Sequence, residues 1–159
     1  MEDISNYDKA KENAINFYHK IGRVRCPAIN NEFIHFTSEG FNHLVYKNDR
    51  RERDRSVQMM KFKLLPKARD IIERSSTYQE YDESLLEIKK EKFKKIVRES
   101  TIVRYWGLVA IIQNFRVKVI VRQCGNGQKH FWSVIPAWSK SHYRNITMIS
   151  KAKGDLSDD

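Results

Sequence analysis

Two histidines near each other in the sequence, His35 and His43, carry side chains suited to proton transfer. Histidine changes its protonation state at about pH 6.5, so it can act as an acid or a base near neutrality. Cleavage of a phosphodiester without a metal ion needs a base for the 2′-hydroxyl, an acid for the leaving oxygen and cations for the phosphorane. His35 and His43 are therefore candidate proton-transfer residues, although a structural role also fits each of them alone.

Cations for such a reaction occur in the last third of the chain. Residues 116–122 alternate in polarity, so a strand there would carry valines on one face and basic residues on the other. The basic residues are Arg116, Lys118 and Arg122. All three are candidates for nucleic-acid binding, and solvation of an outer sheet face is the alternative explanation.

The turn after this strand decides which side chains join its basic residues. The segment Gly125-Asn126-Gly127 contains Asn-Gly, a strong signal for a two-residue hairpin turn. That turn would place Ser133 opposite Ile120, on the basic side of the sheet. A three-residue loop would shift the register by one and bring His130 and Trp132 to that side instead. We favour the two-residue turn.

Further basic residues are candidate phosphate contacts. Arg50, Arg51 and Arg53 belong to a charged run over 47–55, which fits either a phosphate-binding loop or a solvated one. Lys129, beside the hairpin, is another candidate. Arg104 interrupts an apolar segment, where a charge is costly unless it is paired or faces a cleft. Arg104 is therefore a candidate catalytic cation.

The composition restricts the class of protein. The 159 residues include 30 Lys and Arg against 20 Asp and Glu, which gives a net charge of +10 and a pI of about 9.6. This surplus predicts a polyanionic partner such as nucleic acid. No apolar run approaches the roughly 18 residues of a membrane span, and no secretory signal is visible, so we expect a cytoplasmic protein without a membrane partner. The two cysteines and the lack of a ligand pattern predict no metal site and no cofactor.

The elements that must position these residues change type along the chain. Three- and four-residue spacing of apolar residues predicts helices over 4–21 and 38–46, separated by turns and a short strand over 33–36. A further helical stripe over 57–72 is expected to break at Pro66 and to restart there. A basic amphipathic helix is predicted over 84–98.

Near residue 101 the apolar pattern changes from helical spacing to that of strands. Strands are predicted over 102–112, 116–122 and 130–135, joined as an antiparallel meander. The predicted fold class is therefore α+β, with N-terminal helices packed on a C-terminal antiparallel β-meander. We expect a single domain over 1–138, followed by a polar tail over 139–159.

Two segments resemble a known nuclease superfamily. They are Phe41-Asn42-His43-Leu44, and residues 118–122 continuing through His130-Phe131-Trp132-Ser133-Val134-Ile135. Together with helices that precede a meander, they resemble the phage-associated branch of the BECR superfamily, which covers barnase, EndoU, the tRNA-cleaving colicins and the RelE toxins. The resemblance covers residues 33–138 and implies a metal-independent enzyme that cleaves RNA through the 2′-hydroxyl. It places His43, Arg122 and Ser133 at motif positions, and Ser133 would orient a phosphate oxygen.

We therefore expect a metal-independent endoribonuclease of the phage or toxin type, acting on an RNA such as tRNA or mRNA. His43 or His35 would be the base or the acid, and Arg122, Lys118 and Arg104 would stabilise the transition state. An acidic antitoxin or immunity protein is an expected partner. Two alternatives stay open: a non-catalytic RNA- or DNA-binding protein, and a phage or plasmid accessory protein that binds an acidic protein partner.

Overall fold

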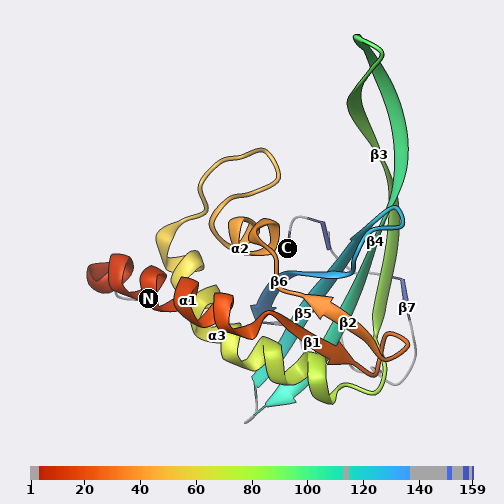
Figure 1. Cartoon of the computed structure of the whole chain (residues 1–159). Helices are drawn as coiled ribbons and strands as arrows, with labels where there is room; N and C mark the ends of the chain where they lie inside the picture. The colour runs from red at the N-terminus through yellow and green to blue at the C-terminus, as the bar shows by residue number, and fades with distance from the viewer. Residues whose placement is uncertain (1–3, 113–114, 137–149, 152–155, 158) are drawn as a thin grey trace.

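The structure is a computed structural model that describes residues 4–112, 115–136, 150–151, 156–157 and 159. Helices come first and most strands follow, in an α+β arrangement (Figure 1). The predicted fold class is confirmed, because the sheet is mostly antiparallel and the helices belong to the N-terminal half. Most of the predicted tail over 139–159 lies outside the described residues.

The N-terminal half supplies the helices. A short 3-10 turn, η1 (Ile4–Asn6), leads into α1 (Tyr7–Ile21). The helix α1 ends at Gly22, whose φ of 66° lies in the left-handed region that favours glycine. The short helix α2 (Ser38–Val45) follows the predicted strand near residue 34, and the long helix α3 (Arg55–Arg74) packs on α1.

Seven strands form one sheet in the order β1-β2-β6-β5-β4-β3-β7. Their bounds are β1 (Arg23–Cys26), β2 (Glu32–His35), β3 (Glu80–Lys92), β4 (Lys95–Ile112), β5 (Phe115–Cys124), β6 (His130–Pro136) and β7 (Ser150–Lys151). The central strands β4, β5 and β6 are joined as the predicted antiparallel meander. Two short parallel contacts, β2 with β6 and β3 with β7, extend the sheet at its edges.

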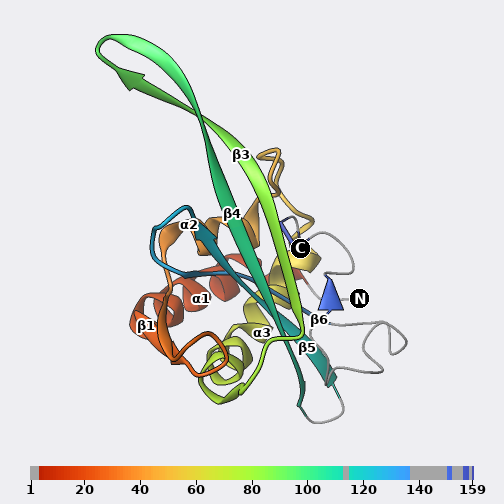
Figure 2. The same ribbon diagram turned by 90° about the vertical axis from the view of Figure 1, so that its right-hand side faces the viewer.

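The two faces of the sheet differ in cover. The helices lie against one face of the sheet (Figure 2), and the main core fills the space between them. There Val117, Val119 and Val121 of β5 belong to the same core cluster as Leu65 and Ile72 of α3. All five side chains are fully buried or nearly so. This confirms the predicted alternation over 116–122, because the valines share one face.

The opposite face of β5 carries Lys118, Ile120 and Arg122, and we call it the basic face. A second, smaller apolar cluster lies there and includes Ile120 and Trp132. Leu156, from the predicted tail, is fully buried in this cluster. The basic face is therefore partly covered by a segment that follows the meander in the chain.

The predicted helix over 84–98 is wrong, because these residues form a long antiparallel hairpin of β3 and β4. The apolar residues that suggested a helical stripe pack on no core: Leu85 is 74% exposed and Phe93 is 97% exposed. The two halves of this segment pair mainly with each other, from Ile88 with Glu99 to Lys92 with Lys95, and this satisfies their backbone hydrogen bonds without a helix. Sequence spacing alone did not separate the two structures.

Two further predictions of local structure are corrected. Pro66 does not break the third helix but lies inside it. A proline removes one backbone hydrogen bond, and the fully buried neighbours Leu65 and Ala68 hold the helix against the core. The turn predicted at Cys26-Pro27 begins one residue later, because Cys26 ends the strand β1, in which Val24 and Cys26 alternate with exposed arginines.

The β5–β6 hairpin combines both registers that the sequence allowed. Ile120 pairs with Ser133, as the two-residue turn predicted, but a bulge follows and Arg122 pairs with His130. The connection runs through a turn closed by the Gly127 amide and the Cys124 oxygen, and it is longer than two residues. The bulge lies at Trp132 and allows both Trp132 and Ser133 to reach the basic face.

Candidate functional site

The helix α2 and the end of the β5–β6 hairpin bring together two of the predicted site residues. The rings of His43 and Trp132 are stacked with their centroids 4.0 Å apart. The Arg122 guanidinium carbon lies 4.2 Å from the centroid of the Trp132 ring. His43 and Arg122, which both occupy motif positions of the resemblance, therefore share one aromatic neighbour on the basic face.

The helix α2 can approach the strand β6 because Gly40 has no side chain. A Cβ atom at Gly40 would lie 2.2 Å from the backbone oxygen of Phe131 and 2.6 Å from the hydroxyl of Tyr18. The same Tyr18 hydroxyl donates a hydrogen bond to the backbone oxygen of Thr37, just before the helix begins. These contacts hold the first turn of α2 against the sheet.

Glu39, in that first turn, lies beside two nitrogen-bearing side chains. Its Oε2 is 3.5 Å from Arg122 Nη1 and 4.0 Å from His130 Nε2. The Glu39 side chain is 67% exposed, whereas those of Arg122 and His130 are 13% and 9% exposed. Within the described residues, Arg122 Nε and His130 Nε2 are buried and have no hydrogen-bond partner. Such atoms are rare in folded proteins and call for a partner such as water or a ligand group.

The surroundings of His130 determine its tautomer and its charge. Its Nδ1 lies 3.4 Å from the backbone oxygen of Gln128, so Nδ1 carries the proton of the neutral ring and Nε2 carries the lone pair. Burial lowers the pKa of His130 and outweighs the hydrogen bond to Gln128, which raises it, while Arg122 lowers the pKa further. His130 is therefore neutral at neutral pH, with Nε2 facing Glu39.

His43 has a different environment from the one expected of a proton-transfer residue. Its side chain is buried, and its Nε2 accepts a hydrogen bond of 3.1 Å from Arg53. Burial, with the charge of Arg53 as the next cause, lowers the pKa of His43 to about 3. Arg53 itself is buried and also donates to the His43 backbone oxygen. These contacts favour a neutral, positioning imidazole at His43 and a structural role for Arg53, which was predicted to bind phosphate.

Ser133 lies in a buried polar cluster next to this group. Its Oγ accepts a hydrogen bond of 2.9 Å from Lys61 Nζ and donates one of 2.9 Å to the Asp159 backbone oxygen. Lys61 Nζ also donates to the same Asp159 oxygen at 2.7 Å. Lys61 and Ser133 are both fully buried or nearly so. The Asp159 backbone oxygen therefore already occupies the position where Lys61 and Ser133 could both donate to a ligand oxygen.

Lys118, a predicted nucleic-acid contact, belongs to the same cluster and is 2% exposed. Its Nζ is 3.0 Å from Asp159 Oδ2 and 3.4 Å from Glu80 Oε2. The backbone oxygen of Ser157 accepts a hydrogen bond from the Trp132 indole. Ser157 and Asp159 thus cover this part of the basic face. A ligand can reach the Lys118 ammonium only if the Asp159 carboxylate moves away from it.

The remaining predicted residues lie farther from Glu39. Arg104 pairs with Gln123 and so lies on the helix-covered face of the sheet, where it is 3.7 Å from Glu83. Arg116 shares the basic face, but the strand rise places it about 20 Å along β5 from Arg122. The structure therefore does not bring Arg104 or Arg116 to the group around Glu39.

The other predicted phosphate contacts are also dispersed. Lys129 forms an ion pair with Glu32 and lies 5.4 Å from the centroid of the Trp106 ring. Arg51 is paired with Asp49, and both are largely exposed. Arg50 is exposed and lines a cavity next to His43. Of this group, only Arg50 is placed to meet a ligand at the candidate site.

Two cavities meet at Glu39. The larger, of about 660 Å³, is lined by Glu39, Asn42, His43, Tyr46, Lys47, Asn48, Arg50 and Trp132. The smaller, of about 290 Å³, is lined by Thr37, Ser38, Glu39, Cys124, Gly127, Gln128 and His130. The exposed carboxylate is therefore accessible from an aromatic, basic cavity and from a smaller polar one.

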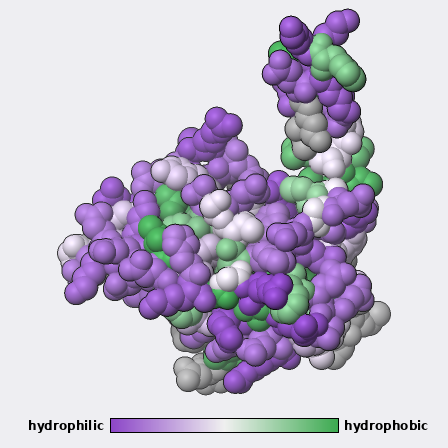
Figure 3. Space-filling view, viewed as in Figure 1, coloured by the Kyte–Doolittle hydropathy of each residue, from purple (hydrophilic) through white to green (hydrophobic). Residues whose placement is uncertain are grey.

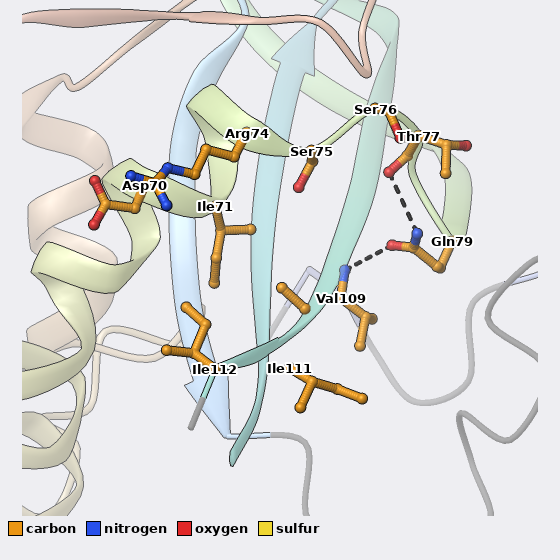
Figure 4. Close-up of a pocket in the computed structure, with 11 residues that line it drawn as sticks. Asp70, Ile71, Arg74, Ser75, Ser76, Thr77, Gln79, Val109, Ile111 and Ile112 are labelled. Atoms are coloured by element: carbon orange, nitrogen blue, oxygen red, sulfur yellow. Dashed lines mark hydrogen bonds between the residues drawn. The ribbon is translucent and has the colours of Figure 1, made fainter. Parts of the chain in front are cut away.

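A further cavity, of about 450 Å³, lies at the other end of α3 (Figure 4). Its wall includes the isoleucines Ile71, Ile111 and Ile112. The amide of Gln79 bridges it, accepting from the Val109 amide and donating to the Thr77 backbone oxygen. Asp70 and Arg74 also line this cavity, but its lining contains no histidine, unlike the group around Glu39.

Sequence reasoning missed Glu39 as a site residue and placed His130 only in the alternative register. One available signal was the four-residue spacing of Glu39 and His43, which puts both on one face of the predicted helix. The position of His130 depends on the bulge in β6, which no local pattern marks. Trp132, the shared neighbour, depends on the same bulge.

Comparisons with protein-family models, with curated proteins and with solved structures found no match for this chain. Among the described residues, no group of three or more His, Cys, Asp or Glu side chains is arranged to hold a metal ion. No helix in the described part of the chain is long and apolar enough to cross a membrane.

Proposed function

We propose that this protein is a metal-independent endoribonuclease, and that Glu39, Arg122 and His130 form its reacting group. The observation that carries the proposal is the exposed Glu39 carboxylate next to two buried nitrogens, Arg122 Nε and His130 Nε2, which have no hydrogen-bond partner among the residues that the structure describes. A carboxylate, an imidazole and a guanidinium can supply the base, the acid and the cation that attack by a 2′-hydroxyl requires.

Each group has a role that its surroundings support. Glu39, the exposed member, accepts the proton of the 2′-hydroxyl. Arg122 stabilises the negative charge of the phosphorane through its guanidinium, whose Nη1 lies 3.5 Å from Glu39 Oε2. His130, whose Nε2 faces Glu39, takes up a proton when bound phosphate raises its pKa, and it donates that proton to the leaving 5′-oxygen. The oxygen that leaves is the 5′-oxygen of the next nucleotide, and the first product is a 2′,3′-cyclic phosphate.

The aromatic cavity next to Glu39 supports the choice of RNA. It contains the Trp132 and Tyr46 rings, on which a base can stack, together with Arg50 and Lys47 for phosphates. Of the catalytic residues expected from the sequence, this assignment retains Arg122. It replaces His43 and His35 by Glu39 and His130 as the proton-transfer groups.

The test is cleavage of total RNA by the purified chain in excess EDTA. We expect cleavage that survives EDTA, and a loss of roughly 10²–10³ in rate for Arg122→Ala, by analogy with removal of an oxyanion donor. The control Arg74→Ala removes an exposed arginine of α3 and should keep full activity. Cleavage only with added magnesium, or none of any RNA, contradicts the proposal. RNA binding without cleavage would favour the non-catalytic binder.

A further inference from the structure

The hairpin of β3 and β4 extends far beyond the body of the protein (Figure 1). We call residues 84–102 the arm. Strand pairing continues to the tip, where Lys92 pairs with Lys95 across a turn made of Phe93 and Lys94. Ten residues separate Lys95 from Tyr105, which neighbours Arg122, so the tip lies about 33 Å from the candidate site.

The turn at the tip contains two residues in an unfavourable backbone conformation. Phe93 and Lys94 have φ values of 51° and 61°, both in the left-handed region. A two-residue hairpin turn of this kind favours Asn-Gly, because bulky side chains are strained there. The Phe93 side chain is also 97% exposed. Phe93 therefore stabilises neither the turn nor the core, and strain of this kind is often associated with function.

The charge of the arm is positive and gathers at its tip. Residues 84–102 contain six lysine or arginine residues and three glutamates. Lys92, Lys94 and Lys95 surround Phe93 and are exposed, and no acidic residue lies between Lys92 and Lys95. Figure 3 shows the arm as a hydrophilic surface interrupted by apolar patches. An aromatic ring among cations is the composition of proteins that bind single-stranded nucleic acid.

We propose that the tip of the arm, residues 92–95, binds an unpaired segment of RNA, with Phe93 stacked on a base and the tip lysines on the flanking phosphates. The choice of RNA over DNA rests on the proposed function. An unpaired segment fits because its bases are free to stack, whereas the deep, narrow major groove of duplex RNA excludes a ribbon of two strands. The core of a protein interface is depleted of charge, unlike this tip.

Two substitutions at Phe93 separate binding from folding. Phe93→Asn removes the ring, keeps every charge and gives the turn a residue that it favours. Phe93→Trp keeps a ring that can stack. Both are made in the full chain and compared by fluorescence anisotropy with a labelled single-stranded RNA of about twenty nucleotides, alongside thermal unfolding. Leu85→Ala is the matched control, because Leu85 is a large, 74% exposed apolar residue of the same arm, far from the tip.

We expect Phe93→Asn to unfold at the same or a higher temperature but to bind RNA about tenfold more weakly, as loss of one stacking contact implies. Phe93→Trp should bind like the original chain, and Leu85→Ala should not change affinity. Lys94→Gln with Lys95→Gln should reduce the slope of log affinity against log salt by roughly 1.4, whereas Phe93→Asn should not change that slope.

Unchanged affinity in Phe93→Asn would overturn the proposal, as would equal or tighter binding of duplex RNA or of single-stranded DNA. A dimer in sedimentation that dissociates on Phe93→Asn would assign the tip to a second copy of this chain instead. The result is independent of cleavage. RNA binding that depends on Phe93, without any RNA cleavage, would support the role of the arm and contradict the proposed nuclease. RNA cleavage, with binding that does not depend on Phe93, would support the nuclease and contradict the role of the arm.

Discussion

The Glu39 carboxylate lies 3.5 Å from the Arg122 guanidinium, one group on the first turn of α2 and the other near the end of β5. If Glu39 takes the proton of the 2′-hydroxyl, Glu39→Gln keeps the shape of the side chain and removes its basicity. We expect RNA cleavage to fall by roughly 10²–10⁴, the usual contribution of one positioned base. Initial rates on a fluorogenic RNA measure this directly.

The control for this prediction is Glu73→Gln, at an exposed position of α3 that forms a surface ion pair with Arg69. It makes the same change of charge away from the site and should keep the original rate. A Glu39→Gln protein that cuts RNA at full speed would show that Glu39 is not the base. His43→Gln would then be the next variant to measure.

The buried His43 predicts how stability depends on pH. In the unfolded chain this group takes up a proton below about pH 6.5, whereas in the folded protein its pKa is about 3. The unfolded state therefore binds more protons between these values. The free energy of unfolding should fall by about 1.4 kcal/mol for each pH unit below 6.5 because of this group, and His130 acts in the same direction.

Urea denaturation at pH 7 and pH 5 measures this effect. His43→Gln cannot be protonated and still offers an oxygen to Arg53, so its loss of stability between the two pH values should be smaller by about 2 kcal/mol. Carboxylates titrate alike in both proteins, so the difference between them isolates His43. Parallel pH dependence in the two proteins would mean that His43 is protonated in the folded state.

The close contact at Gly40 predicts that the site depends on α2 lying against β6. Gly40→Ala would place a Cβ 2.2 Å from the Phe131 oxygen, so the helix must move. We expect a loss of about 1–3 kcal/mol in the free energy of unfolding, as for other overpacked sites. Ser38→Ala, at an exposed position of the same helix, should be close to neutral. Equal stability of Gly40→Ala and the original chain would argue against this packing.

The contacts of Asp159 predict that RNA has only partial access to the basic face. Its carboxylate is 3.0 Å from Lys118, and its backbone oxygen accepts from Lys61. Asp159→Asn weakens this contact, so RNA should bind about fivefold more tightly and with a steeper dependence on salt, a change equivalent to roughly 1 kcal/mol. Asp70→Asn makes the same change of charge at an exposed position of α3 and serves as the control. Weaker binding of RNA by Asp159→Asn would identify the contact as structural support for the face.

The sequence predicted those elements in which local pattern and long-range packing agree. Alternation over 116–122 and helical spacing over 4–21 each expose one apolar face, and both elements are present. Residues 84–98 fit either structure, and pairing with the strand that follows decides between them. Much of that pairing is local, such as Lys92 with Lys95, but no Asn-Gly or similar signal marks the turn at Phe93 and Lys94.

Of the candidate site, the sequence predicted some residues but not their neighbours. Motif positions indicated His43 and Arg122, and the structure brings both against Trp132. The bulge in β6 and the close approach of α2 decide which side chains surround them, and both depend on contacts between distant segments. For this reason Glu39 and His130 became visible as a pair only in three dimensions.

The most direct test of the account is the chemical identity of the RNA ends that the protein produces. The purified chain is incubated in EDTA with a synthetic RNA, and the fragments are weighed by mass spectrometry. Attack by the 2′-hydroxyl predicts a 2′,3′-cyclic phosphate on the upstream fragment and a 5′-hydroxyl on the downstream one. The same RNA with a single 2′-deoxy nucleotide at the cut position should stay intact there. A 5′-phosphate on the downstream fragment, or cleavage at the deoxy position, would contradict the account.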